Sequence, residues 1–118
     1  MNIPDVHFFG VQSTCPDIRI GSDMIDTAGT ITKAAEMMMS KGARSVRAIA
    51  THPVLSGLAY STIANSSLEE VIVTDTIPLS CNPDVNKDKI KVLSIAREFA
   101  DIIDKVYNFQ SISSKFTL

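Results

Sequence analysis

The sequence predicts an α/β fold of three layers, α/β/α, in which helices cover both faces of a mostly parallel sheet. Three short apolar segments of β-type composition, residues 45–50, 69–73 and 90–93, are separated by runs of helical or loop composition. Strand patterns that alternate with helix patterns are typical of such a sheet. The length of 118 residues allows one small domain with a modest core, built on about four strands.

The first elements in chain order are a short strand over residues 17–20, a polar loop, and a helix over Gly29–Ser40. Ala and Met residues give this helix its propensity and much of its apolar face, and Lys41 with Gly42 ends it. The three consecutive Met residues at 37–39 are typical of soft core filling rather than of a cofactor site.

The polar loop, residues 22–31, has the composition of a phosphate-binding site. Its backbone N–H groups from Thr27 to Thr30 have no partner in the following helix and point outward with the positive end of the helix dipole. The two Thr hydroxyls add donors. Asp23 and Asp26 would repel a phosphate, but they accept hydrogen bonds from hydroxyl groups. The loop therefore predicts a ligand that carries both a phosphate and hydroxyls, such as a sugar phosphate.

Two later segments bring polar groups to the same edge of the sheet. Residues 51–57 and 74–78 each follow a predicted strand, and ligands of open α/β sheets bind along this carboxyl edge. His52 is either a proton carrier or phosphate contact, or a turn residue before a proline, and the pattern favours the turn. Asp75 is either a ligand contact or a turn-forming residue, and the turn is again favoured.

The remaining elements are a short helix within residues 58–67, a surface loop over residues 79–88, and a helix that Ser94 can cap. That last helix carries one broad apolar face. Its apolar residues are Ile95, Ala96, Phe99, Ala100, Ile102, Ile103 and Val106. Residues 108–118 show no strong periodicity.

Composition excludes several classes of partner. A net charge of −2 gives no basic patch, so we expect neither nucleic acid nor an anionic membrane surface as a general partner. No apolar run approaches the ~20 residues that span a bilayer, and the N-terminus lacks a signal pattern, so we expect a cytoplasmic protein. Cys15 and Cys81 lack CxxC or Cys/His spacing, which favours free thiols over a disulfide or a zinc site.

Five blocks of the chain, in order and at fitting spacing, resemble a single protein family. They are residues 23–35, 50–57, 73–79, 89–94 and 98–100, and the first begins Asp23-Met24-Ile25-Asp26-Thr27-Ala28-Gly29-Thr30. This first block resembles the phosphoribosyl-binding motif of ribose-phosphate pyrophosphokinase, also called PRPP synthetase. Residues 111–116 resemble that family's C-terminal end. An Asp-Thr-x-Gly-Thr motif alone would indicate any phosphoribosyltransferase, but the further blocks favour this one family.

The resemblance implies that residues 22–118 are the C-terminal part of a phosphoribosyltransferase-like domain, and that residues 1–21 are a divergent N-terminal segment. The implied ligands are ribose 5-phosphate and PRPP. Their implied binding residues are Ser22, Asp23, Asp26, Thr27, Ala28, Gly29 and Thr30. The family has two adjacent acids where this chain has Ser22 and Asp23, so a hydroxyl replaces the first acid.

The tail has two interpretations. In the resembled family it takes part in a regulatory anion and nucleotide site between subunits. That role would fall on Ser111, Ser113, Ser114 and Phe116. The other interpretation is a frayed chain end.

The activity that the resemblance implies is transfer of a diphosphate from MgATP to ribose 5-phosphate, which yields AMP and PRPP for nucleotide biosynthesis. The family's ATP pocket, its metal-holding residues and its mobile catalytic loop precede the motif. The ligands of Mg²⁺ and ATP are therefore expected largely outside this chain. We assign no catalytic residue and no metal ligand to it.

Three hypotheses follow from the sequence. The chain is part of a PRPP synthetase that carries the ribose 5-phosphate loop and is inactive alone. Alternatively, it is a non-catalytic regulatory or binding subunit that assembles with full-length PRPP synthetase, or it is a truncated product. An open edge of a partial sheet favours association, so we expect a homo-oligomer or assembly with full-length chains.

Overall fold

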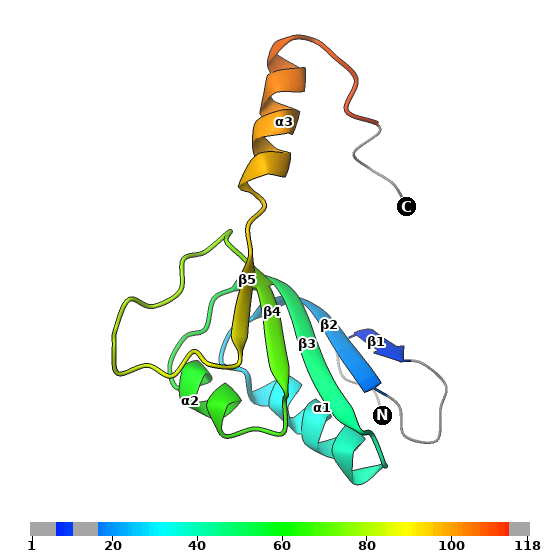
Figure 1. The fold of residues 1–118 in the computed structure, drawn as a ribbon, viewed down its shortest axis with the longest axis vertical. Coiled ribbons are helices and arrows are strands. Elements are labelled where there is room, and N and C mark those ends of the chain that lie inside the picture. The colour runs from blue at the N-terminus through cyan, green and yellow to red at the C-terminus, as the bar shows by residue number, and fades with distance from the viewer. Residues whose placement is uncertain (1–6, 11–16, 114–118) are drawn as a thin grey trace.

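The computed structural model describes residues 7–10 and 17–113. Their five strands form one sheet with the strand order β1-β2-β3-β4-β5 (Figure 1). The strands are β1 (His7–Gly10), β2 (Asp17–Ile25), β3 (Ser45–Pro53), β4 (Glu70–Thr74) and β5 (Ile90–Leu93). The four strands from β2 to β5 pair in parallel, and β1 pairs antiparallel to β2. The predicted α/β class with a mostly parallel sheet is confirmed.

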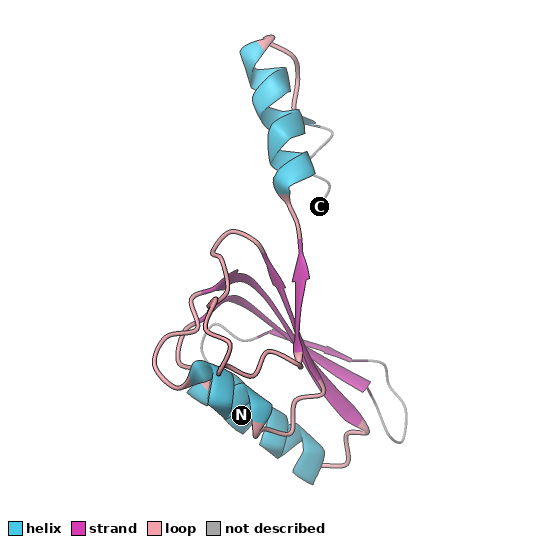
Figure 2. Cartoon of the chain, turned by 60° about the vertical axis from the view of Figure 1, so that its left-hand side comes forward, coloured by secondary structure: helices cyan, strands magenta, loops and turns pink. Residues whose placement is uncertain are grey.

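Two of the three described helices lie on the same face of the sheet (Figure 2). They are α1 (Gly29–Ser40), which has the predicted bounds, and α2 (Ala59–Ala64). The strands advance in one direction from β2 to β4, so right-handed crossovers place both connecting helices on one side. The third helix, α3 (Ala96–Tyr107), extends away from the sheet and has no buried residue (Figure 1). The described residues therefore form two layers where the sequence predicted three, because α3 does not return to the open face.

The core lies between the sheet and the two helices α1 and α2. Alternate strand residues point into it, as the two-residue period of a strand requires. The buried strand residues include Ile20, Val46, Ala48, Ala50, Val71 and Val73, and the buried helix residues include Ile31, Ala34, Ala35, Ala59 and Ile63. Met38 packs against this core, whereas Met39 is exposed. The role of the Met run as core filling is thus confirmed for Met38.

The end of α1 follows the predicted stop signal. Gly42 has φ of 99°, in the left-handed region that glycine adopts without steric cost. Its N–H donates to the carbonyl of Met39 at 3.2 Å, and the N–H of Ala43 donates to the carbonyl of Met38 at 3.1 Å. These bonds satisfy carbonyls at the helix end and turn the chain toward β3.

Strands β2 and β3 are longer than predicted, and the sheet has one strand more. Strand β2 runs to Ile25, so Ser22 and Asp23 lie in a strand rather than in a loop. Parallel pairing of Ile25 with Pro53 carries both β2 and β3 beyond their apolar segments. Strand β1 was not predicted from the sequence. The division between residues 1–21 and 22–118 stays a prediction.

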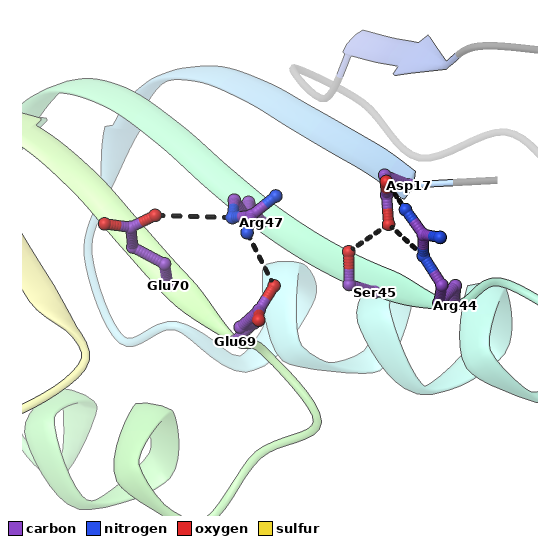
Figure 3. A network of polar contacts seen from close by, with 6 residues as sticks. All are labelled: Asp17, Arg44, Ser45, Arg47, Glu69 and Glu70. Carbon is purple, nitrogen blue, oxygen red and sulfur yellow. Dashed lines mark hydrogen bonds and ion pairs between the residues drawn. The ribbon is translucent and has the colours of Figure 1, made fainter.

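A polar network ties the starts of β2, β3 and β4 together (Figure 3). The Arg44 guanidinium forms two hydrogen bonds with the Asp17 carboxylate, one of them at 3.0 Å from Nε to Oδ1. The Ser45 hydroxyl donates to the same Oδ1 at 2.7 Å. Arg47, on β3, forms ion pairs with Glu69 at 3.0 Å and with Glu70, the first residue of β4, at 3.3 Å. The hydrogen bonds from Arg44 and then Ser45 lower the pKa of Asp17 from 3.8 to about 2.

This shift predicts how Asp17→Asn changes the acid stability of the fold. A carboxylate whose folded pKa is lowered stabilises the fold above its unfolded pKa, and that contribution is lost as pH falls through about 2. We expect Asp17→Asn to be less stable than wild type at neutral pH, with the difference shrinking as pH falls from 4 toward 2. Urea unfolding across this range measures it, with Asp84→Asn in an exposed loop as the control. A difference that does not change with pH would contradict the role of the ionised carboxylate.

Candidate functional site

A cavity of about 360 Å³ lies where β2 passes into α1. It is lined by residues 22–31, which include every residue that the sequence assigned to sugar phosphate binding. The structure therefore brings those residues to one place, although the strand contributes Ser22 and Asp23 and the helix contributes Gly29 and Thr30. Which ligand they bind stays a prediction.

One wall of the cavity is the N-terminus of α1. Ala28 has φ of 69°, and the first hydrogen bond of the helix runs from the Thr32 N–H to the Ala28 carbonyl at 3.1 Å. The N–H groups of Gly29, Thr30 and Ile31 thus precede the hydrogen-bond ladder. The buried Thr32 hydroxyl also donates to the Ala28 carbonyl, at 2.8 Å, which holds the turn in place. The first turn of α1 carries no acidic residue, so this end favours an anion.

The acids and hydroxyls of residues 22–31 line the same cavity. Asp23, Asp26, Thr27 and Thr30 are exposed. Ser22 is half-buried, and its hydroxyl donates to the Met24 carbonyl at 2.9 Å. The cavity therefore offers backbone N–H and hydroxyl donors together with carboxylate acceptors.

A second loop, residues 54–58, contacts this site and was not assigned to it from the sequence. The Ser56 hydroxyl donates to Oδ1 of Asp26, and the Ser56 N–H donates to the Asp26 carbonyl at 3.0 Å. The sequence placed residues 51–57 at the same edge of the sheet. No pattern in the sequence indicates that Ser56 contacts Asp26, which lies 30 residues earlier in the chain.

The other two candidates serve the scaffold. His52 Nδ1 lies 2.9 Å from the Thr76 hydroxyl, which donates to the Thr51 carbonyl at 3.2 Å, so His52 links the ends of β3 and β4. Asp75 accepts hydrogen bonds from the Ile95 N–H at 3.0 Å and from the Ser94 hydroxyl at 2.7 Å. These bonds lower the pKa of Asp75 and hold the start of α3 against the end of β4.

The predicted regulatory tail is only partly described. Ser111 and Ser113 are exposed, and their hydroxyl oxygens lie 2.9 Å apart. Ser114 and Phe116 lie outside the described residues. The regulatory role stays a prediction.

Cys81 is an exposed free thiol, and Cys15 lies outside the described residues. Within residues 17–113, whose side chains the structure describes, no group of three or more His, Cys, Asp or Glu side chains could hold a metal ion. In the same part of the chain, no helix is long and apolar enough to cross a membrane.

Comparison with known proteins identifies the family. Residues 12–117 match the family described as phosphoribosyl synthetase-associated domain. A ribose-phosphate pyrophosphokinase from Wolinella succinogenes is 51% identical over 100 residues, which cover 85% of this chain and 31% of that protein. One from Haemophilus ducreyi is 45% identical over 111 residues, which cover 94% of this chain and 34% of that protein.

A solved structure agrees with these matches. The crystal structure of phosphoribosylpyrophosphate synthetase from Mycobacterium smegmatis superposes with a TM-score of 0.72 at 34% sequence identity, covering 86% of this chain and 36% of that one. The chain spans about a third of the length of the relatives that it matches. It belongs to the ribose-phosphate pyrophosphokinase, or PRPP synthetase, family.

Proposed function

We propose that this cytoplasmic chain supplies the ribose 5-phosphate and PRPP site of a ribose-phosphate diphosphokinase, which converts ATP and ribose 5-phosphate into AMP and PRPP. The observation that carries the proposal is the cavity between β2 and α1, where phosphate donors and hydroxyl acceptors face one space. A ligand that carries both a phosphate and hydroxyls matches that combination. The family relationship supports the same ligand.

In this proposal the N–H groups of Gly29, Thr30 and Ile31 donate to the phosphate, with help from the Thr27 hydroxyl. Charge-assisted hydrogen bonds of this kind are about twice as strong as neutral ones. Asp23 and Asp26 accept hydrogen bonds from the ribose hydroxyls. Binding of both the phosphate and the hydroxyls fixes the direction of the sugar, so its anomeric hydroxyl is held in one orientation for the transfer.

Transfer of a diphosphate needs Mg²⁺ and cationic groups that offset the charge on the transferred group. Among the described side chains, no three or more His, Cys, Asp or Glu form a group that could hold a metal ion, and residues 22–31 include no Lys or Arg. We therefore assign the ATP, Mg²⁺ and catalytic groups to the remaining two thirds of a family chain, and we expect the isolated chain to be inactive.

Calorimetric titration of the purified chain tests this function. We expect saturable binding of ribose 5-phosphate, no binding of MgATP, and weaker binding of ribose, which lacks the phosphate. A folded sample that does not bind ribose 5-phosphate would contradict the proposal, as would one that binds MgATP.

A second candidate function is that of a non-catalytic subunit that assembles with other PRPP synthetase chains. The surface of α3 favours it, since Phe99, Ile103 and Val106 are each more than half exposed, at 53%, 65% and 57%. The sheet face that α1 and α2 leave open carries the exposed residues Ile49 and Leu93. The part of a relative that this chain does not match makes up about two thirds of that relative, and we propose that part as the partner for these surfaces.

This candidate predicts association in trans. The chain is mixed with the unmatched part of the Wolinella succinogenes protein and followed by analytical ultracentrifugation. We expect a complex, and we expect Phe99→Ala to weaken it about tenfold, because truncating a buried aromatic anchor removes a main source of interface energy. Arg97→Ala on another side of α3 is the control. A chain that pairs only with itself would instead support a homo-oligomer. A chain that stays monomeric both alone and in the mixture would contradict the candidate.

A further inference from the structure

We propose that Ser56 is a positioning residue for sugar recognition, because it orients the Asp26 carboxylate toward the ribose hydroxyls. This inference rests on the function proposed above and adds to it a residue from a different loop. Phosphate recognition by the N-terminus of α1 does not depend on it.

Three hydrogen bonds join the Ser56 loop to the end of β2. The Leu55 N–H donates to the Ile25 carbonyl at 2.9 Å, and the Ser56 N–H donates to the Asp26 carbonyl at 3.0 Å. The Ser56 hydroxyl donates to Oδ1 of Asp26. Two backbone bonds therefore fix the position of residue 56, and the side-chain bond transfers that position to the Asp26 carboxylate.

The loop itself is held in a demanding conformation. Leu55 has φ of 48°, in the left-handed region that a side chain of this size rarely adopts. Its side chain is nevertheless buried in the core, with 5% of its surface exposed. A conformation of this kind persists only where the surrounding structure holds it. The buried Leu55 side chain thus anchors the Ser56 hydroxyl beside the cavity.

The bond from Ser56 leaves Asp26 able to bind a ligand. Asp26 is exposed and lines the cavity, and Oδ2 remains available when Oδ1 accepts the Ser56 hydroxyl. An oriented carboxylate loses less rotamer freedom when the sugar binds. This effect acts on the hydroxyl groups of the ligand and leaves the amide groups of Gly29 and Thr30 unchanged.

Two ligands and three variants test the inference. Wild type, Ser56→Ala, Ser56→Thr and the exposed-loop control Ser67→Ala are titrated with ribose 5-phosphate and with inorganic phosphate. We expect Ser56→Ala to bind ribose 5-phosphate about tenfold more weakly, because the Asp26 carboxylate is no longer held in one orientation before the sugar binds. We expect its affinity for inorganic phosphate to stay unchanged. Ser56→Thr keeps the hydroxyl and should restore binding of ribose 5-phosphate, and Ser67→Ala should resemble wild type.

Each other outcome overturns part of the account. Equal losses for both ligands in Ser56→Ala would show a general disturbance of the loop and would overturn the positioning role. Unchanged affinity for ribose 5-phosphate would overturn it too, while the proposed function would stand. A wild-type chain that does not bind ribose 5-phosphate would overturn the proposed function and this inference with it.

Discussion

Gly29→Val is expected to lower the affinity for ribose 5-phosphate by at least about 100-fold, because two or more charge-assisted hydrogen bonds to the phosphate are lost. Gly29 is the first residue of α1 and lines the cavity. A phosphate oxygen must come within hydrogen-bond distance of the neighbouring N–H groups. The two branches of a Val side chain would occupy that space.

The structure predicts that this variant still folds. A Cβ added at Gly29 has only the Thr27 hydroxyl oxygen as a neighbour, at 4.0 Å, which is ordinary van der Waals contact. Glu36→Val, at an exposed position of the same helix, controls for the effect of a β-branched residue on α1. Calorimetry with ribose 5-phosphate measures the loss in samples whose thermal unfolding shows them to be folded. Wild-type affinity in Gly29→Val would mean that the phosphate binds elsewhere.

Ser22→Asp is expected to raise the affinity for ribose 5-phosphate roughly tenfold, because a charge-assisted hydrogen bond of ~1.5–3 kcal/mol replaces a neutral one of ~0.5–1.5 kcal/mol. Ser22 lines the cavity beside Asp23, and it stands where the resembled family has the first of two adjacent acids. A carboxylate there would accept from a ribose hydroxyl. The Ser22 hydroxyl now donates to the Met24 carbonyl, and that bond would be lost.

Two comparisons separate this effect from others. Ser22→Asn has nearly the same shape as Ser22→Asp but no charge, so it should give little or no gain. Inorganic phosphate should bind Ser22→Asp no better than wild type, because the added negative charge repels it. An affinity for ribose 5-phosphate that does not rise in Ser22→Asp would mean that the hydroxyl already serves this position.

Elements governed by local signals could be predicted from the sequence. The bounds of α1 follow from its Ala and Met run and from Gly42, and the structure has the same bounds. Strand β5 also has the predicted bounds, because an apolar run between polar loops marks it. The residues around the cavity were found because consecutive positions in one connection line it.

Features that depend on distant contacts could not be predicted. Strand β2 extends through Ser22 and Asp23 because it pairs with β3, yet polar residues at a strand end resemble a loop in sequence. The bond from Ser56 to Asp26 joins residues 30 positions apart. The apolar face of α3 was predicted correctly, but its exposure was not, since a periodic pattern does not say which surface covers it.

The most direct test of the central claim is an amide NMR titration of the isotopically labelled chain with ribose 5-phosphate. If the cavity between β2 and α1 binds the phosphate, the largest and saturable shifts will come from the N–H groups of Gly29, Thr30 and Ile31. Largest shifts at the opposite ends of the strands, near Arg44 and Glu70, or in the tail near Ser111, would contradict the account.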